Sequence, residues 1–238
     1  MKSSKAVLTG SLALFLILLT SMCSVADYED TVKKSFNVSK GGLLTIETDR
    51  GSIEISTHDK AVVDVELVRK LASESLVDNV ITNFEHEGAN VTIETKVKKG
   101  LIHFGRDIKL KYLVTVPKAY NLDLSTAGGS ISVDDLNGNV DVKTSGGSLA
   151  FGNITGPVNG KTSGGSIKLE ECKGTVMVNT SGGSISIGQV EGDVEAKTSG
   201  GSIKIDKAAG SVTAKTSGGS IKIEEVMGDI QASTSGGS

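Results

Sequence analysis

Hydrophobic residues in the C-terminal half of the chain recur with a period of 18. In each repeat, two apolar residues separated by one other residue follow the tetrapeptide Ser-Gly-Gly-Ser, and one more apolar residue stands three positions later. A glycine comes next, and a second apolar pair follows it. Alternation with a period of two is typical of short strands with one buried side. The tetrapeptide begins at Ser145, Ser163, Ser181, Ser199, Ser217 and Ser235, and a variant of it begins at Ala127.

A single repeat buries almost no surface, so the repeats must stack to form a core. Stacking places each residue over the one 18 positions later, at the strand spacing of about 4.8 Å. The sequence therefore predicts an all-β fold, a parallel β-solenoid with 18-residue coils. We expect the glycine columns to supply turns with positive φ and the column that contains Cys172 to be buried. Left-handed hexapeptide solenoids are excluded because they need an aliphatic residue at every sixth position; a right-handed solenoid is expected.

Residues 27–118 form a less regular region that still carries traces of the repeat. The segment 44–55 fits the repeat from its second strand through the turn into its first strand, and 91–95 resembles another second strand. Between these segments, residues 73–83 carry apolar residues at helical spacing, with Ser73 as a candidate N-cap. We expect irregular first coils interrupted by one short helix over about 73–83, which covers the open end of the rod.

The predicted organisation has three parts: a signal peptide (1–26), the irregular region (27–118) and the repeat solenoid (119–238). After the last Ser-Gly-Gly-Ser, the sequence stops at Ser238 without the strand that follows every earlier copy. Because the ends of solenoids need polar caps, we expect either a truncated chain or end-to-end self-association with another subunit.

The first 26 residues have the pattern of a signal peptide. Lys2 and Lys5 precede an apolar run over 6–22, and Ser24-Val25-Ala26 offers the small residues that signal peptidase recognises. Two alternatives are a retained membrane anchor, for which the run is short, and a lipoprotein signal that uses Cys23. Cleavage after Ala26 predicts an exported protein in the periplasm, on the cell surface or secreted, with no membrane span in the mature chain.

Charge and composition exclude several classes of function. The chain has a formal net charge of -3, and loss of the two N-terminal lysines takes it to -5, so no nucleic-acid partner is expected. Aromatic residues make up 3% of the chain and Trp is absent, which suits a thin core of stacked strands better than a globule. A single threonine column, turned inward or toward the corner, does not give the outward array of an ice-binding solenoid.

The sequence contains no pattern that predicts catalysis, a metal site or a cofactor. His58, His86 and His103 lack metal-ligand spacing, and the glycine-rich turns match neither a P-loop nor a calcium-binding nonapeptide repeat. Acidic pairs at 134–135, 170–171 and 224–225 would lie at least two coils apart, or about 10 Å. Non-enzymatic function is therefore predicted, and the alternative is a β-helix enzyme that acts on cell-wall or extracellular polysaccharide.

Lysine is the only outward chemistry that recurs along the repeats. A soluble face that discourages edge association explains such columns, but a linear array of ammonium groups also suits a polyanion with regularly spaced charges. The candidate binding residues fall in two columns, Lys143, Lys161, Lys197 and Lys215 in one and Lys168, Lys204 and Lys222 in the other.

Three segments together resemble the bacterial "putative adhesin" β-repeat family, which is also classed as a domain of unknown function. They are Thr48-Asp-Arg-Gly-Ser-Ile-Glu-Ile55, Val114-Thr-Val-Pro-Lys118 and the serial Lys-Thr-Ser-Gly-Gly-Ser-Ile-Lys-Ile units. The resemblance covers nearly all of the chain after residue 26. It implies a β-solenoid in a bacterial envelope or secreted protein, and it brings no catalytic residues with it.

Together these observations predict an exported, non-enzymatic envelope or surface protein that binds or scaffolds in the manner of an adhesin. The expected partners are anionic envelope polymers, such as teichoic acid, lipopolysaccharide or an acidic glycan, or other surface proteins.

Overall fold

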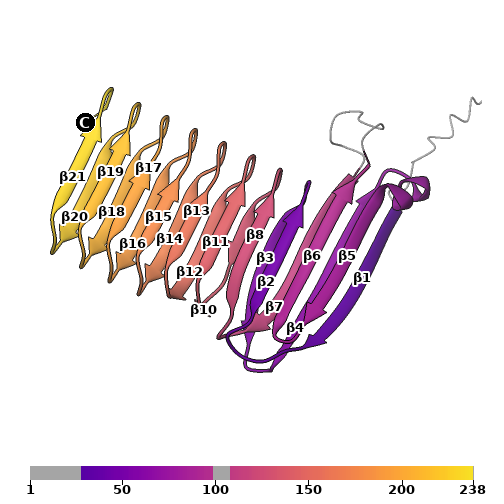
Figure 1. The fold of residues 1–238 in the computed structure, drawn as a ribbon. Helices are drawn as coiled ribbons and strands as arrows, with labels where there is room; N and C mark the ends of the chain where they lie inside the picture. Colours follow the sequence, from indigo (N-terminus) through magenta and orange to yellow (C-terminus); the bar gives the residue numbers. More distant parts are fainter. Residues whose placement is uncertain (1–27, 99–107, 238) are drawn as a thin grey trace, which may run out of the picture.

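The computed structural model describes residues 28–98 and 108–237, so the predicted signal peptide and His103 lie outside the described residues. Two long sheets face each other along a rod, and the coils follow one another in sequence order from β8 to β21 (Figure 1). The eleven-stranded sheet contains the first strand of each repeat, and the ten-stranded sheet contains the second.

The eleven-stranded sheet consists of β1 (Tyr28–Asn37), β3 (Ser52–His58), β4 (Val62–Leu71), β7 (Ile108–Pro117), β9 (Ile131–Val133), β10 (Leu136–Asn137), β12 (Leu149–Thr155), β14 (Ile167–Cys172), β16 (Ile185–Val190), β18 (Ile203–Ala208) and β20 (Ile221–Val226). The ten-stranded sheet consists of β2 (Leu43–Thr48), β5 (Val80–Glu87), β6 (Asn90–Val97), β8 (Asn121–Thr126), β11 (Val140–Thr144), β13 (Val158–Lys161), β15 (Val176–Asn179), β17 (Val194–Lys197), β19 (Val212–Thr216) and β21 (Ile230–Thr234).

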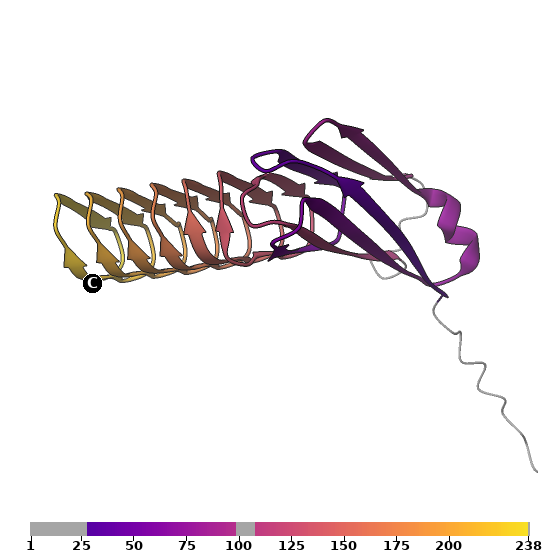
Figure 2. The same ribbon diagram turned by 90° about the horizontal axis from the view of Figure 1, so that it is seen from below.

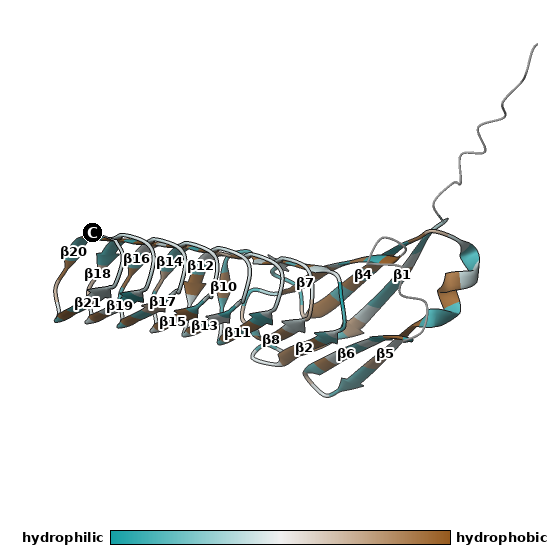
Figure 3. Ribbon diagram, turned by 90° about the horizontal axis from the view of Figure 1, so that it is seen from above, coloured by the Kyte–Doolittle hydropathy of each residue, from teal (hydrophilic) through white to brown (hydrophobic). Residues whose placement is uncertain are grey.

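Neighbouring coils pair in parallel with a shift of one repeat, which confirms the predicted solenoid. Ile185 lies beside Ile203 in the eleven-stranded sheet, and Val194 lies beside Val212 in the ten-stranded sheet. In the coils up to β19, the alternate side chains that point between the sheets are buried, and Cys172 is among them, as expected. In the last coil, Ile221 and Ile223 are half-buried and Ile230 is exposed. Figure 3 shows hydrophobic (brown) and hydrophilic (teal) positions alternating along the strands. The apolar alternation in the sequence therefore becomes one continuous core.

The same coil geometry extends into the N-terminal region. β2 and β3 stack on β8 and β9, with Leu44 beside Leu122 and Ile53 beside Ile131, so the segment 44–55 is a coil of the solenoid. β6 and β7 form the next coil outward, which confirms 91–95 as a second strand. The coil of β2 and β3 thus lies between two coils that follow it in the chain.

Antiparallel strands and one short helix complete this end of the rod. β5 pairs with β6, β4 pairs with β7, and β1 pairs with β4, all antiparallel. The helix η1 is a 3-10 helix over Glu74–Asn79, and Figure 2 shows it at the opposite end from β21. Residues 80–83, expected to be helical, already belong to β5, because pairing with β6 overrides their helical spacing. Ser73 stands at the N-cap position, as expected, but its side chain makes no capping hydrogen bond. Its hydroxyl contacts the Ser75 hydroxyl instead.

The glycine-rich corners of the coils are held by backbone contacts rather than by positive φ angles. Among the described glycines of the repeat region, only Gly129 and Gly156 have positive φ, so the expected reason for the glycine columns is wrong. A Cβ atom on Gly183 would instead overlap the carbonyl oxygen of Gly165 in the preceding coil. The buried Thr180 hydroxyl donates to that same carbonyl at 2.8 Å. Each coil therefore sits on the backbone of the coil before it.

Candidate functional site

Asp134, Asp135 and Glu170 line one hollow of the eleven-stranded sheet, and two of these carboxylates already have polar partners. Asp135 accepts hydrogen bonds from the backbone and side-chain nitrogens of Asn153 at 2.8 and 2.9 Å, which lower its pKa. Glu170 pairs with Lys168 at 3.2 Å. Within residues 28–98 and 108–237, no three His, Cys, Asp or Glu side chains gather as metal ligands. Asp135 and Glu170 therefore bind neighbouring side chains on the surface.

In the eleven-stranded sheet, each lysine of the repeat column has a carboxylate partner on its own strand. Side chains two positions apart on a strand point to the same face, so each of these lysines contacts an acidic residue of the same repeat. The pairs are Lys168–Glu170 at 3.2 Å, Lys204–Asp206 at 2.5 Å and Lys222–Glu224 at 2.8 Å. The hydrogen bond that the Lys204 ammonium donates to Asp206 raises the pKa of Lys204. This face is locally neutralised.

The lysines of the ten-stranded sheet are far less neutralised. The register places Lys143 beside Lys161 and Lys197 beside Lys215, with Asn179 between the two pairs. Lys197 forms an ion pair with Glu195. The other three lysines are exposed, and they make no ion pair with any residue that the structure describes. Exposed ammonium groups therefore follow one another along this face at multiples of about 4.8 Å.

Toward the N-terminal end, the same column changes sign. The register continues from Lys143 to Ser125, then to Glu47 and Glu94. The charged column, in order along the rod, consists of Glu94, Glu47, Ser125, Lys143, Lys161, Asn179, Lys197 and Lys215.

An acidic recess of about 380 Å³ lies beside the first part of the charged column. Its lining includes Glu47, Asp49, Glu94 and Lys96. Glu94 binds Lys96 at 2.5 Å and raises the pKa of that lysine, and Asp49 accepts a hydrogen bond from the Val97 backbone at 2.9 Å. Glu47 has no ion pair among the described residues. The recess therefore keeps acceptor capacity for a further cation.

Sequence reasoning found the lysine columns but missed the acids. The signal was present, because the segment from Leu44 to Thr48 has the alternation of the segment from Val140 to Thr144. In that alignment Glu47 takes the position of Lys143.

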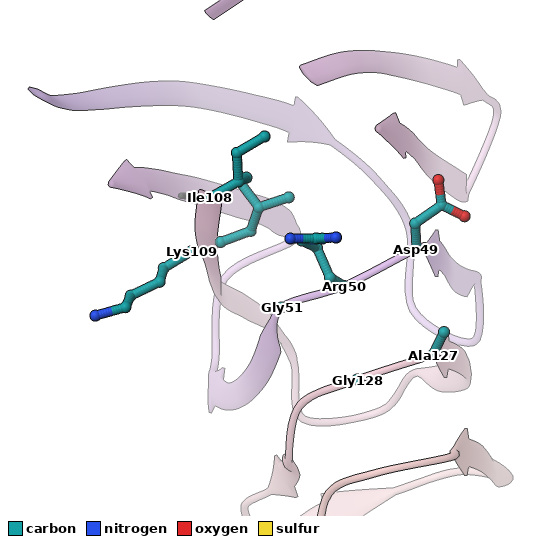
Figure 4. Close-up of a pocket in the computed structure, with 8 residues that line it drawn as sticks. Asp49, Arg50, Gly51, Ile108, Lys109, Ala127 and Gly128 are labelled. Atoms are coloured by element: carbon teal, nitrogen blue, oxygen red, sulfur yellow. The ribbon is translucent and has the colours of Figure 1, made fainter. Parts of the chain in front are cut away.

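Other hollows lie on the surface of the described residues, and the one on the ten-stranded sheet, of about 580 Å³, is lined by Asp123, Asp141, Asn159 and Met177 among others. Two more lie elsewhere on that surface. One, of about 420 Å³, is lined by Asp49, Arg50, Ile108, Lys109 and neighbouring glycines. Figure 4 shows the Arg50 guanidinium below Ile108, whereas Asp49 and Lys109 extend away from it on opposite sides. The other, of about 520 Å³, lies over Ala150 and Gly152 on the eleven-stranded sheet, and its lining includes three carboxylates, Lys118 and Lys168. Both of these lysines have ion pairs, so neither hollow contains a series of lysines without them, as the charged column does.

The fold and this face define a class of protein, a parallel β-solenoid with charged columns on its outer surface. The chain belongs to the Toastrack DUF4097 family, whose model matches residues 42–237. This match confirms the family resemblance seen in the sequence. No described helix has the length and hydrophobicity to cross a membrane.

Several solved structures are similar over most of the chain. A "putative cell adhesion protein" from Clostridium sporogenes ATCC 15579 is 12% identical, with a TM-score of 0.36, and 88% of this chain and 100% of that chain are covered. A "putative adhesin" from Bacteroides fragilis NCTC 9343 is 15% identical, with a TM-score of 0.31 and coverage of 86% and 97%. A "putative lipid binding protein" from Parabacteroides distasonis ATCC 8503 is 15% identical, with a TM-score of 0.36 and coverage of 86% and 96%. No curated protein sequence matches the chain.

Proposed function

We propose that the chain is an exported, non-enzymatic envelope or surface protein that binds linear anionic polymers through the lysines of the ten-stranded sheet. The observation that carries this proposal is the difference between the two faces. Lys143, Lys161 and Lys215 have no carboxylate partner among the described residues, whereas Lys168, Lys204 and Lys222 of the other column each have one. A polyanion would therefore gain more new ion pairs along the first column than along the second.

The chemistry of the face indicates how such binding would behave. Lysine is a compact charge on a flexible stem, so it binds anions with little geometric selectivity. Exposed charges are screened by salt over about 8 Å at physiological ionic strength. The expected ligands are teichoic acid, lipopolysaccharide or an acidic glycan, and the binding is weak and sensitive to salt.

The polysaccharide-cleaving alternative has less support. Retaining and inverting glycosidases use two carboxyl groups that flank one bond, and Glu170 and Asp135 are instead engaged with Lys168 and Asn153. Incubation with cell-wall polysaccharides should therefore yield no product, and product that disappears in a Glu170→Gln variant would favour the enzyme.

Charge reversal on the two faces tests the proposed binding. In the variant Lys143→Glu/Lys161→Glu, affinity for immobilised lipoteichoic acid at low salt should fall by roughly tenfold or more, because the ligand then meets two like charges. Lys204→Glu/Lys222→Glu is the matched control, since it makes the same charge change at adjacent positions of the other sheet. Equal losses in both variants, or no binding by the unmodified protein, would overturn the proposal.

A further inference from the structure

Positive and negative charges are separated along the charged column, and polyanion binding does not use this separation. Acidic residues occupy one end, at Glu94 and Glu47, and lysines occupy the other, from Lys143 to Lys215. Both ends lie in one column of one exposed sheet face. The paired lysines and acids of the eleven-stranded sheet alternate locally, and that face has no such separation.

A face with separated charges is complementary to a reversed copy of itself. If two rods met through their ten-stranded sheets in the same direction, lysines would face lysines. A two-fold axis in the interface, parallel to the strands and midway between β11 and β13, reverses one rod. It places Glu47 opposite Lys197 of the second copy and Glu94 opposite its Lys215, because each pair lies at equal distances on the two sides of the axis. Such a contact is isologous, so each pair occurs twice.

We propose that two copies of this chain associate face to face and antiparallel through their ten-stranded sheets, in this register. Each new pair contains one residue that makes no ion pair among the described residues, Glu47 in the first and Lys215 in the second. Their opposite members, Lys197 and Glu94, already bind Glu195 and Lys96, so the new contacts extend existing pairs into networks.

The main unfavourable contact of the proposed interface is a repulsion between lysines at its middle, and nearby polar residues reduce it. Lys143 would face Lys161 of the second copy, which is unfavourable. Beside them lie Asp141 and Asn159, joined by a hydrogen bond of 2.9 Å. Asp141 lies two residues before Lys143 on β11, so it supplies a negative charge beside that lysine on each copy. Ser125 would face Asn179, a neutral polar contact that needs no compensation.

The size of the face indicates a weak, reversible dimer. The charged column spans eight strands, from β6 to β19, which corresponds to about 34 Å at the strand spacing, and the strands are about 15 Å long. Complete contact would bury roughly 500 Å² on each copy, near the lower limit for a specific interface. Met177, 49% exposed, is an apolar side chain on this face that such contact would cover.

The inference does not depend on the proposed polyanion binding, but it shares lysines with it. A polyanion would compete with the second copy for Lys197 and Lys215. The two ideas fail separately, because Glu47 and Glu94 contribute only to self-association.

A charge-swap experiment tests the dimer and its register. Sedimentation velocity of the purified chain at low salt should show a concentration-dependent dimer, and its dissociation constant should increase roughly tenfold or more at physiological salt. Glu47→Lys/Glu94→Lys and Lys197→Glu/Lys215→Glu should each be monomeric, because all four pairs become repulsive. An equimolar mixture of the two variants should form a heterodimer, because all four pairs then become attractive again.

Restored association in the mixture would show that both variants fold, so misfolding cannot produce the expected result. The control Lys204→Glu/Lys222→Glu, on the other face, should dimerise like the unmodified chain. Glu47→Lys/Glu94→Lys should bind lipoteichoic acid at least as tightly as the unmodified chain, because it keeps every lysine of the column and adds two. A chain that stays monomeric at low salt, variants that dimerise normally, or a mixture that remains monomeric would each overturn the inference.

Discussion

The N-terminal and repeat regions share one core, but different contacts hold them together. Residues 121–237 contain one aromatic residue, Phe151, and their coils stack through repeated bonds between threonine hydroxyls and glycine carbonyls. Before residue 121, the core contains the fully buried Tyr112 and Tyr120. The Tyr112 hydroxyl contacts the Thr48 hydroxyl at 3.1 Å, and the Tyr120 hydroxyl donates to the Ala89 carbonyl.

This difference shows two ways to stabilise the same strand geometry. Repeated backbone contacts allow any number of equal coils. They leave no room for a Cβ atom where a glycine lies against the carbonyl oxygen of the preceding coil. Large side chains fill an irregular space, so they tolerate antiparallel strands and a helix beside the coils. The repeat region should therefore be most sensitive to small additions at its corners, and the N-terminal region to changes at its tyrosines.

The largest expected effect comes from Gly183→Ala. The added Cβ would overlap the Gly165 carbonyl oxygen, so two coils must separate, and the free energy of unfolding should fall by about 3 kcal/mol. Chemical denaturation followed by circular dichroism measures this loss.

Gly182→Ala is the matched control one residue earlier. A Cβ atom there meets its nearest neighbour, the Gly164 carbonyl oxygen, at 3.4 Å, and its effect should stay within about 0.5 kcal/mol. Equal losses in the two variants would show that close approach of the backbones is not what requires glycine.

A smaller effect is expected from alkaline pH, and it should originate in the N-terminal region. Burial raises the pKa of Tyr120 from 10.0 to about 12. The neutral phenol is thus favoured in the folded state, so its contribution to stability is complete below pH 10 and is lost as the pH rises toward 12. Burial also raises the pKa of Tyr112.

Denaturation across this pH range, compared with Tyr120→Phe, measures that contribution. The variant should be less stable at neutral pH by about 1 kcal/mol, because it loses the bond to the Ala89 carbonyl, but its stability should fall less steeply above pH 10. An identical slope in both proteins would contradict the assignment of the alkaline loss to Tyr120.

The sequence was most informative where one residue type recurs at one structural position. Columns with a period of 18 predicted the coils, their register and the burial of Cys172, because stacked coils make each column a single environment. The end of the helix could not be predicted, since Val80 and Phe84 suit both a helix and β5 until β6 is present to pair with them.

The candidate site was only partly predictable for a similar reason. The lysine columns follow from the repeat alone. Whether each lysine is neutralised depends on a carboxylate two residues away, as in Lys222 and Glu224, and on side-chain geometry that spacing does not specify. The acidic end of the charged column also depends on β2 lying next to β8, although β3 to β7 come between them in the chain.

The central claim is that the ten-stranded sheet is the binding face, and a lysine footprint tests it without any substitution in the chain. Acetylation of exposed lysines, quantified by mass spectrometry with and without lipoteichoic acid at low salt, reports which ammonium groups the polymer covers. The account predicts protection of Lys143, Lys161 and Lys215, with Lys168, Lys204 and Lys222 modified as in the free protein. Equal protection of both sets, or protection confined to the second set, would contradict it.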